Sequence, residues 1–360
     1  VTASGIESTA FGQNTTASGD NATAIGEQTL ASGDRATAMG VLTIASGPIS
    51  TAIGNQTEAS NQSSLAGGEF SIASGYTSLA IGSGVTASGL ESTAFGKNTT
   101  ASGTRATAMG ENTQAIGENS TSMGQNTQAS GNESTAMGYL THAEAVYSTA
   151  MGNQTIATGW ASTAMGTNTE ADGLGSSSMG VYTKASDYGS LAIGHYNLLG
   201  STATTSNNEF SSANTAFVVG NGTDENNRSD AFVVMFNGDA TLAGNLSVNS
   251  DARLKSNIIS LGSTMSKLLE IDGKSYIMKK DEKKEQKIGL LAQDIEKVFP
   301  ELVSESNGIK SVNYQGLVPV LINALKEQDV KMKEQQMEIE SLRDQEKRID
   351  RLEKLIAQLD

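Results

Sequence analysis

The fold follows from the stretch Ala101-Ser-Gly-Thr-Arg-Ala-Thr-Ala-Met-Gly-Glu-Asn-Thr-Gln114, whose 14-residue pattern recurs fourteen times without a gap between Ala3 and Leu198. Alanine opens every unit, and glycine stands at the tenth place of every unit. A strict short period is typical of a solenoid, in which each repeat is one coil that buries its apolar side by stacking on its neighbours. More than half of the chain is therefore expected to be a rod.

Within one unit, Thr107-Ala108-Met109 alternates in side-chain size with the period of two that is typical of a strand. Gly110 is expected to end that strand with a turn or a close backbone approach. Two short strands and two turns per unit predict a flattened β-coil. The ninth place carries a bulky apolar residue in every unit but one, and we interpret this stripe as the core of the coil. The ninth-place residues are Phe11, Ile25, Met39, Ile53, Gly67 (the exception), Ile81, Phe95, Met109, Met123, Met137, Met151, Met165, Met179 and Ile193.

One large apolar residue per coil makes a thin core. At ~25 cal/mol per Å² of buried apolar area, it contributes a few kcal/mol against roughly 1–2 kcal/mol of backbone entropy for each ordered residue. A single rod is therefore expected to be marginal. Small residues at the eighth and tenth places let backbones approach closely, so we expect several rods to pack together through that face.

The repeats Ser148-Thr-Ala-Met-Gly152 and Ser92-Thr-Ala-Phe-Gly96 resemble the head domains of trimeric autotransporter adhesins. This resemblance implies a left-handed parallel β-roll shared by three chains, and some phage fibres use similar repeats. It covers residues 3–198. Because Val1-Thr2 reads like the last two places of a preceding unit, we expect the natural chain to extend further at its N-terminus.

Acidic residues are concentrated in the first part of the chain. Residues 1–249 hold 5 Lys+Arg and 19 Asp+Glu, a net charge of −14, whereas residues 250–360 hold 19 and 20, a net charge of −1. An acidic rod repels phosphate backbones, so no nucleic-acid partner is expected. The sequence contains no apolar run of transmembrane length, so no membrane insertion is expected.

No metal and no cofactor are assigned to this chain. It has no cysteine, and the Gly-Gly-x-Gly-x-Asp signature of calcium-binding β-helices is absent. His142 and His195 have no companion histidine and are interpreted as surface residues. Regular threonine at the thirteenth place, as in Thr15, Thr29 and Thr113, could form an ice-binding array, but we interpret it as ordinary solvated threonine.

After Leu198 the period fails, and residues 199–249 are predicted to form a β-rich connector. Two similar apolar runs predict strands, two Asn-Gly dipeptides predict tight turns, and the polar segment between the runs predicts a solvated loop. These features are Ala216–Gly220 and Ala231–Phe236, Asn221-Gly222 and Asn237-Gly238, and Asp224–Arg228.

Residues 250–330 contain four ordered motifs. They are Ser250-Asp-Ala-Arg-Leu-Lys255 with Ile258, Ile288-Gly-Leu-Leu-Ala-Gln-Asp-Ile295, Val298-Phe-Pro-Glu-Leu-Val303, and Val312-Asn-Tyr314 with Leu317-Val-Pro-Val-Leu321. Together they resemble the endosialidase-type intramolecular chaperones, also called the S74 peptidase family, which often has Asp where this chain has Asn313. The resemblance implies a trimeric chaperone that helps the preceding fibre to fold and then cuts itself off.

Carried over from that family by position, Ser250 is the expected nucleophile, Lys255 the expected base and Asn249–Ser250 the expected scissile bond. A serine hydroxyl needs a base to take its proton, and a lysine can do so only if burial lowers its pKa from ~10.4 towards neutrality. Cutting therefore requires a dry, assembled site. Asp251 and Arg253 are expected to position the turn. The alternative interpretation makes Ser250 a helix N-cap and Lys255 a solvated side chain.

The tail is predicted to be helical from about Leu317, with its last part, residues 331–360, forming a three-stranded coiled coil. Apolar residues recur every seven positions with charges between them, and the frame of the repeat shifts near residue 340. The stripe consists of Leu325, Met332 and Ile339 in one frame, and of Leu342, Ile349, Ile356, Leu352 and Leu359 in the next. Such a trimer would register the three chains before the rod forms.

The leading hypothesis is a homotrimeric fibre or adhesin, in a virion tail fibre or at a cell surface, with a surface glycan or protein as receptor. Its only enzymatic activity would be a single self-cleavage. One alternative is a tailspike that hydrolyses glycans, for which the repeats offer acids such as Glu7, Glu91 and Glu118, although no insertion interrupts the period to form a cleft. Another is a passive spacer whose binding tip lies outside this chain.

Overall fold

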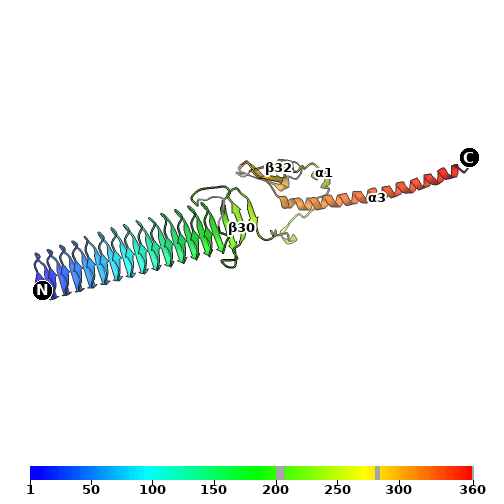
Figure 1. Ribbon diagram of the computed structural model, residues 1–360. Helices are drawn as coiled ribbons and strands as arrows, with labels where there is room; N and C mark the ends of the chain where they lie inside the picture. Colours follow the sequence, from blue (N-terminus) through cyan, green and yellow to red (C-terminus); the bar gives the residue numbers. More distant parts are fainter. Residues whose placement is uncertain (200–206, 280–283, 359–360) are drawn as a thin grey trace. The chain divides into compact units, whose positions relative to one another are not determined.

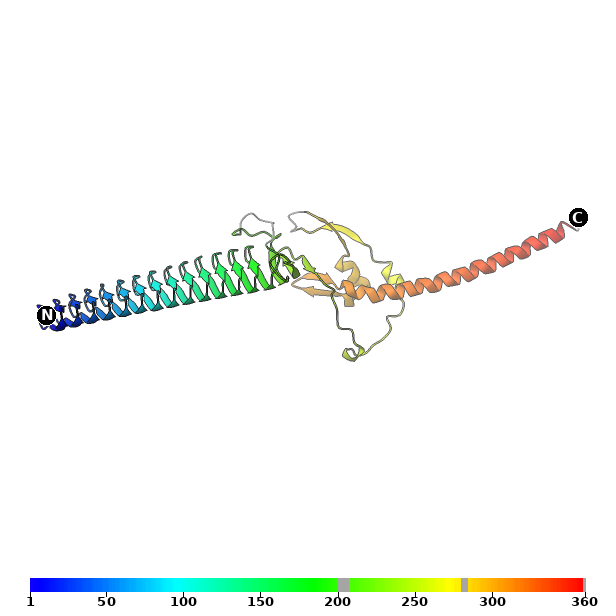
Figure 2. The ribbon, with the colours of Figure 1, turned by 60° about the horizontal axis from the view of Figure 1, so that its bottom comes forward.

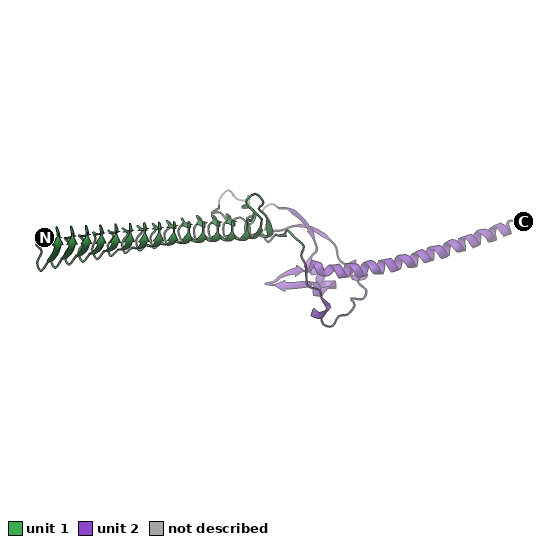
Figure 3. Cartoon of the chain, turned by 90° about the horizontal axis from the view of Figure 1, so that it is seen from below, with its two compact units in different colours: residues 1–246 green, residues 247–360 purple. Residues whose placement is uncertain are grey.

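The computed structural model describes residues 1–199, 207–279 and 284–358. It divides into two compact units, Val1–Leu246 and Ser247–Asp360, which are described separately (Figure 3). The first unit is a parallel β-solenoid, and the second combines short strands with helices. The fold is therefore mainly β with a long C-terminal helix, as the sequence predicts.

Each 14-residue unit of the rod forms one coil with one long and one short strand, and within the rod each strand pairs in parallel with its equivalent fourteen residues later (Figures 1 and 2). The last two strands of the rod, β27 (Lys184–Ala185) and β28 (Leu191–His195), have no such equivalent in the described part of the chain. In the described residues 1–199, the long strands are β2 (Thr9–Gln13), β4 (Thr23–Glu27), β6 (Thr37–Val41), β8 (Thr51–Asn55), β10 (Leu65–Glu69), β12 (Leu79–Ser83), β14 (Thr93–Lys97), β16 (Thr107–Glu111), β18 (Thr121–Gln125), β20 (Thr135–Tyr139), β22 (Thr149–Asn153), β24 (Thr163–Thr167), β26 (Ser177–Val181) and β28 (Leu191–His195). The short strands are β1 (Thr2–Ala3), β3 (Thr16–Ala17), β5 (Leu30–Ala31), β7 (Ile44–Ala45), β9 (Glu58–Ala59), β11 (Ile72–Ala73), β13 (Thr86–Ala87), β15 (Thr100–Ala101), β17 (Gln114–Ala115), β19 (Gln128–Ala129), β21 (His142–Ala143), β23 (Ile156–Ala157), β25 (Glu170–Ala171) and β27 (Lys184–Ala185).

The interior of the coil is lined by small residues, and the expectation that the ninth-place stripe forms its core is wrong. Alanines at the first and eighth places, such as Ala101 and Ala108, are fully buried, whereas Ile53 at the ninth place is 46% exposed. Successive side chains of a strand point to opposite faces, so an inward Ala108 places Met109 outside. Before the end of the rod, the side chains buried in the coils are those of alanine, serine, threonine and Val85, so the interior holds no side chain as large as methionine. The expected packing of rods through the Ala and Gly face is wrong for the same reason, because Ala108 faces the lumen.

The thirteenth-place threonines also line the interior, so the interpretation of them as solvated residues is wrong. Thr15, Thr29 and Thr113 are each at most 1% exposed, and their hydroxyls have no hydrogen-bond partner. They cannot present an array to ice or to any other ligand. Val85 takes the same place in the sixth unit and is equally buried, so the slot accepts an apolar side chain of the same shape.

The tenth-place glycines allow the coils to stack. Gly110 has a φ of +127°, and a Cβ added there would lie 1.9 Å from the carbonyl oxygen of Gly124 in the next coil. Only glycine combines this conformation with so close an approach. The expected close backbone approach at Gly110 is therefore observed. The expectation that the strand ends there with a turn is wrong, because the strand continues to Glu111.

The connector extends the long-strand wall of the rod. Strand β29 (Thr215–Asn221) pairs in parallel with β28, and β30 (Asp230–Met235) and β31 (Ala240–Leu242) follow in antiparallel order. The turn predicted at Asn237-Gly238 lies between β30 and β31, with Gly238 at a φ of +91°. The turn predicted at Asn221-Gly222 is wrong, because the chain reverses instead at Asp224, whose carboxylate accepts from the amides of Asn226 and Asn227.

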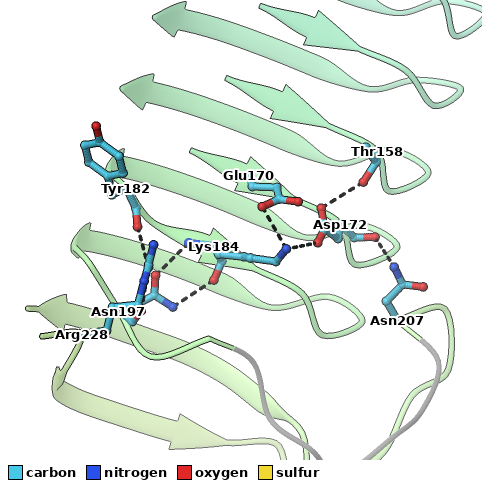
Figure 4. Close-up of polar contacts among 8 residues, drawn as sticks. All are labelled: Thr158, Glu170, Asp172, Tyr182, Lys184, Asn197, Asn207 and Arg228. Atoms are coloured by element: carbon cyan, nitrogen blue, oxygen red, sulfur yellow. Dashed lines mark hydrogen bonds and ion pairs between the residues drawn. The ribbon is translucent and has the colours of Figure 1, made fainter. Parts of the chain in front are cut away.

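The free edge of the last short strand, β27, forms hydrogen bonds with side chains instead of with a further strand (Figure 4). Asn197, which replaces threonine at the thirteenth place, accepts from the Lys184 amide at 2.8 Å and donates to the Lys184 carbonyl at 2.9 Å. Its amide group thus substitutes for the peptide group of the missing neighbour. Arg228 donates to the carbonyls of Tyr182 and Asn197 at 3.0 and 3.1 Å, so the end of the predicted solvated loop instead contacts the rod.

The second unit is built around one small apolar cluster. Its elements are η1 (Ala252–Leu254), α1 (Met265–Leu268), β32 (Lys274–Ile277), β33 (Gln286–Gly289), α2 (Ala292–Val298), η2 (Pro300–Leu302), β34 (Val303–Ser306), β35 (Ile309–Val312), η3 (Tyr314–Gly316) and α3 (Leu317–Ile356). Strands β32 and β33 pair antiparallel, as do β34 and β35. Ile295 of α2 and Phe299, which follows α2, are buried against Val320 near the start of α3.

Helix α3 leaves its apolar stripe in solvent along most of its length. Leu325, Met332, Ile349 and the other described stripe residues are between 44% and 64% exposed. Leu359 lies outside the described residues. A row of large apolar side chains at heptad spacing without a covering surface is characteristic of a helix that associates with other helices.

Candidate functional site

Ser250 and Lys255 lie within hydrogen-bond reach of each other. The Lys255 Nζ donates to the Ser250 Oγ at 2.7 Å, which is a geometry suited to transfer of the hydroxyl proton. The two residues are five positions apart in the sequence, and the 3-10 turn η1 between them bends the backbone so that both side chains meet.

Asp251 holds that turn. Its carboxylate accepts from the Arg253 amide at 2.9 Å and forms an ion pair with the Arg253 guanidinium at 2.6 Å. The hydrogen bonds from the Arg253 side chain, followed by the one from its amide, lower the pKa of Asp251 below its usual value. The N-cap of the turn is therefore Asp251, and not Ser250 as the alternative interpretation requires.

The Asn249–Ser250 peptide bond lies in an exposed segment without regular structure. Such a bond is accessible to attack because no strand or helix hydrogen bond has to be broken first. Ser250 and Lys255 are exposed as well. A single chain therefore lacks the dry surroundings that the chemistry needs.

The remaining motifs of the chaperone segment contribute to its packing. Ile295 of the second motif is fully buried, and Phe299 of the third packs against it. In the fourth motif, the hydroxyl oxygen of Tyr314 accepts a hydrogen bond from the Leu290 amide at 2.9 Å. Asn313 accepts from the Gly316 amide at 3.1 Å, a capping role for which the oxygen of either Asn or Asp is suitable.

A second candidate surface is the ninth-place stripe on the long-strand wall of the rod. None of its residues is buried, and Phe11, Met39 and Met179 are among those classed as exposed. Because one such side chain follows another at every coil except the one with Gly67, the stripe runs along the rod with a single gap. Exposed apolar surface of this extent marks an interface.

The acids considered for glycan hydrolysis do not form a catalytic pair. Glu7 and Glu91 stand at the same place of units six coils apart, which is roughly 29 Å at about 4.8 Å per coil. Glu118 forms an ion pair with Arg105 at 2.5 Å. A glycosidase needs two carboxylates about 5–9.5 Å apart, so Glu7 and Glu91 are too far apart to be such a pair, and the carboxylate of Glu118 is already paired with Arg105.

Comparison with known families agrees with this architecture. Residues 3–28, 31–57, 87–113, 115–141, 143–169 and 171–197 match the YadA head domain repeat. Residues 250–304 match the family described as chaperone of endosialidase, which covers the first three of the four motifs. No curated protein matches the chain.

Six segments of the rod thus match YadA-type head repeats, and the start of the second unit matches an endosialidase-type chaperone. Both families comprise trimeric proteins that are exposed at surfaces or associated with phage tails, so the matches support a trimeric adhesin or fibre with a chaperone domain. In the described parts of the chain, no helix has both the length and the apolar character needed to cross a membrane.

Proposed function

We propose that this chain is the subunit of a homotrimeric fibre or adhesin, as in a phage tail fibre or a surface appendage, and that residues 250–360 direct its folding and then release themselves. The observation that carries the proposal is the hydrogen bond between Lys255 and Ser250 next to an exposed peptide bond. The exposed stripes of the rod and of helix α3 support the trimer, because association would remove both from water.

The proposed reaction is a single hydrolysis of the Asn249–Ser250 bond. Lys255, in its neutral form, takes the proton of the Ser250 hydroxyl, and the oxygen attacks the carbonyl carbon of Asn249. The carbon–nitrogen bond breaks, Lys255 returns the proton to the departing amino group of Ser250, and an ester joins Asn249 to the Ser250 oxygen. Water then hydrolyses the ester, which leaves a carboxylate on Asn249 and a free amino group on Ser250.

Trimer formation couples this reaction to folding. In one chain Lys255 is exposed, and a lysine becomes a base only when its surroundings exclude water. Packing of three chains around the α3 helices would supply those surroundings. Premature cutting is thereby avoided, because the base forms only after assembly.

The chaperone segment also addresses the problem of register. Nearly identical coils can pair out of register by any multiple of fourteen residues, and long-range β assembly is slow. Three chains joined first at their C-terminal helices would start the rod from one defined end. Release of that end after folding would leave the fibre kinetically trapped.

The test is the denatured intact mass of freshly expressed protein beside two variants. We expect two fragments meeting at Asn249–Ser250 in the parent and one full-length chain in Ser250→Ala. Lys255→Arg keeps the positive charge and the donor but cannot act as a base at neutral pH, so it should also stay intact. A single full-length mass in the parent, or cleavage in both variants, would refute the Ser/Lys mechanism and reduce the segment to a trimerisation domain.

A further inference from the structure

Trp160, the sole tryptophan of the chain, is half-exposed on the surface of the rod. It stands at the fourth place of its unit, where other units have residues as different as Asp20, Gln62 and Asn132, so the fold does not require a large aromatic side chain there. Tyr147 from the preceding coil meets it edge to face, with the ring centroids 5.5 Å apart and the planes at 85°. The contact fixes the orientation of the indole ring.

The Trp160 ring borders an open depression of about 690 Å³, which is in the range of small-molecule sites. Val146, Trp160 and Leu174 supply its apolar wall, while Glu144, Thr158 and Asn208 supply polar groups. An aromatic surface next to a few hydrogen-bonding groups is suited to a ligand with an apolar face and several polar groups.

The polar side of the depression is held by a network around Asp172 (Figure 4). Thr158 donates to its Oδ1 at 3.0 Å, and Lys184 contacts its Oδ2 at 2.8 Å and Glu170 at 2.9 Å. Partial burial disfavours the charge of Lys184, but the hydrogen bonds and charges of Asp172 and Glu170 outweigh it and raise the pKa of the ammonium. Asn207 donates to the Asp172 carbonyl at 3.0 Å and so ties the connector to the rod beside the depression.

The depression lies on the wall of the rod that the apolar stripe does not occupy. Glu144, Thr158 and Asp172 directly follow the short strands β21, β23 and β25, whereas the stripe runs along the long strands. Association of three rods through the stripe therefore leaves this surface free to bind a ligand.

We propose that this depression binds a neutral sugar, namely a glucose, galactose or N-acetylhexosamine unit of a surface glycan. The apolar face of such a pyranose packs on the Trp160 ring, and its hydroxyl groups exchange hydrogen bonds with Thr158 and Glu144. Sialic acid and other anionic sugars are disfavoured, because Glu144 lines the depression, Lys184 is already paired with Glu170 and Asp172, and the rod as a whole is acidic. The inference deepens the proposed adhesin function and rests on it.

The fluorescence of Trp160 reports directly on this site, because no other tryptophan contributes. Intact protein is titrated with lactose, cellobiose and N,N′-diacetylchitobiose, and with 3′-sialyllactose as the acidic counterpart of lactose. We expect a saturable change in Trp160 emission with at least one neutral sugar and none with 3′-sialyllactose. By calorimetry, Trp160→Ala should weaken binding of that sugar at least tenfold. Tyr76→Ala, which removes an exposed aromatic residue at the fourth place of a distant unit, should change it less than twofold.

Thr158→Val keeps the shape of the site and its fluorescence, and should weaken binding at least threefold. The proposal is overturned if none of the three neutral sugars gives a saturable change up to 50 mM, or if Trp160→Ala and Tyr76→Ala have equal effects. It is also overturned if emission shifts with protein concentration in the absence of sugar, which would identify a second copy of the chain as the occupant. Cleavage at Asn249–Ser250 does not involve Trp160. A negative result in the cleavage test can therefore be distinguished from a negative result in the sugar-binding test.

Discussion

At the scale of single residues, the rod is governed by what each place of the coil can accommodate. The tenth place needs a residue without a side chain, the first and eighth need a small one, and the ninth tolerates a large one because it points outwards. The fifth unit has glycine at both the ninth and the tenth place, so the requirements of the two places can be tested separately in it. Gly67 stands at the ninth place and Gly68 at the tenth.

Gly68→Ala should destabilise the rod strongly, whereas Gly67→Ala should be tolerated. A Cβ on Gly68 would lie 2.1 Å from the Gly82 carbonyl oxygen at a φ of +99°, while one on Gly67 would have Ile81 as its nearest neighbour at 3.6 Å. We expect a loss of more than about 3 kcal/mol for Gly68→Ala, measured as a shift of the guanidinium unfolding midpoint. Equal midpoints for the two variants would contradict this account of the stacking.

Thr113→Val should stabilise the rod, because the buried Thr113 hydroxyl has no hydrogen-bond partner and Val85 occupies the equivalent slot naturally. The gain should be about 1 kcal/mol in the free energy of unfolding. Thr127→Val is the matched control, since it would deprive the buried Ser122 hydroxyl of its partner at 2.7 Å and should bring no gain. A lower stability for Thr113→Val than for Thr127→Val would refute the argument.

At the scale of elements, side-chain hydrogen bonds decide where the solenoid ends. Asn197 closes the last short strand with its side-chain amide. The sequence indicates that the last unit is special, since only this unit has asparagine at the thirteenth place. The pattern does not show in which direction the side-chain amide points. The role of Arg228 depends on the path of the connector and has no signal in the sequence.

Glu327 joins helix α3 to the start of α1. Its carboxylate accepts from the Thr264 amide at 2.5 Å and from the Ser263 hydroxyl at 2.7 Å. These hydrogen bonds, the Thr264 amide first, lower the pKa of Glu327. A carboxylate with a lowered pKa stabilises the folded state fully above its unfolded value of about 4.3, and that stabilisation is lost as the pH falls through the lower folded value.

Glu327→Gln should therefore loosen α1 at neutral pH and remove the acid dependence of its stability. The measurement is hydrogen exchange of the peptide covering residues 263–270 in intact Ser250→Ala protein, corrected for the intrinsic rate at each pH. Protection in the parent should fall between pH 5 and 3, whereas protection in Glu327→Gln should start lower and change little. Glu334→Gln, on the same helix, should behave like the parent. An unchanged acid transition in Glu327→Gln would exclude this role.

At the scale of the whole molecule, the two apolar stripes require partners, and the α3 stripe is the one that can be altered without affecting the coils. Ile349→Asp should give a chain that neither forms trimers nor cleaves itself, because a carboxylate replaces an apolar side chain in the proposed helix interface. Lys347→Asp introduces the same residue outside the stripe and breaks only an exposed ion pair with Asp344, which contributes about 1 kcal/mol or less.

Sedimentation and intact mass of the full chain distinguish the two variants. The expected result is an uncut monomer or aggregate for Ile349→Asp and a processed trimer for Lys347→Asp. A trimeric, cleaved Ile349→Asp protein would show that assembly does not depend on the helix.

The sequence by itself determined the coil, the places that pair between neighbouring coils and the presence of the chaperone segment, because the 14-residue period sets equivalent residues side by side and the motifs are continuous in the chain. The tertiary structure decided which face of each strand encloses the lumen. Alternation defines two faces, but only the folded coil, whose interior buries small side chains, assigns Ala108 to the inside and Met109 to the outside. It also brought Asn208 of the connector to the depression beside Trp160, because contacts between residues far apart in the sequence depend on the folded path of the chain.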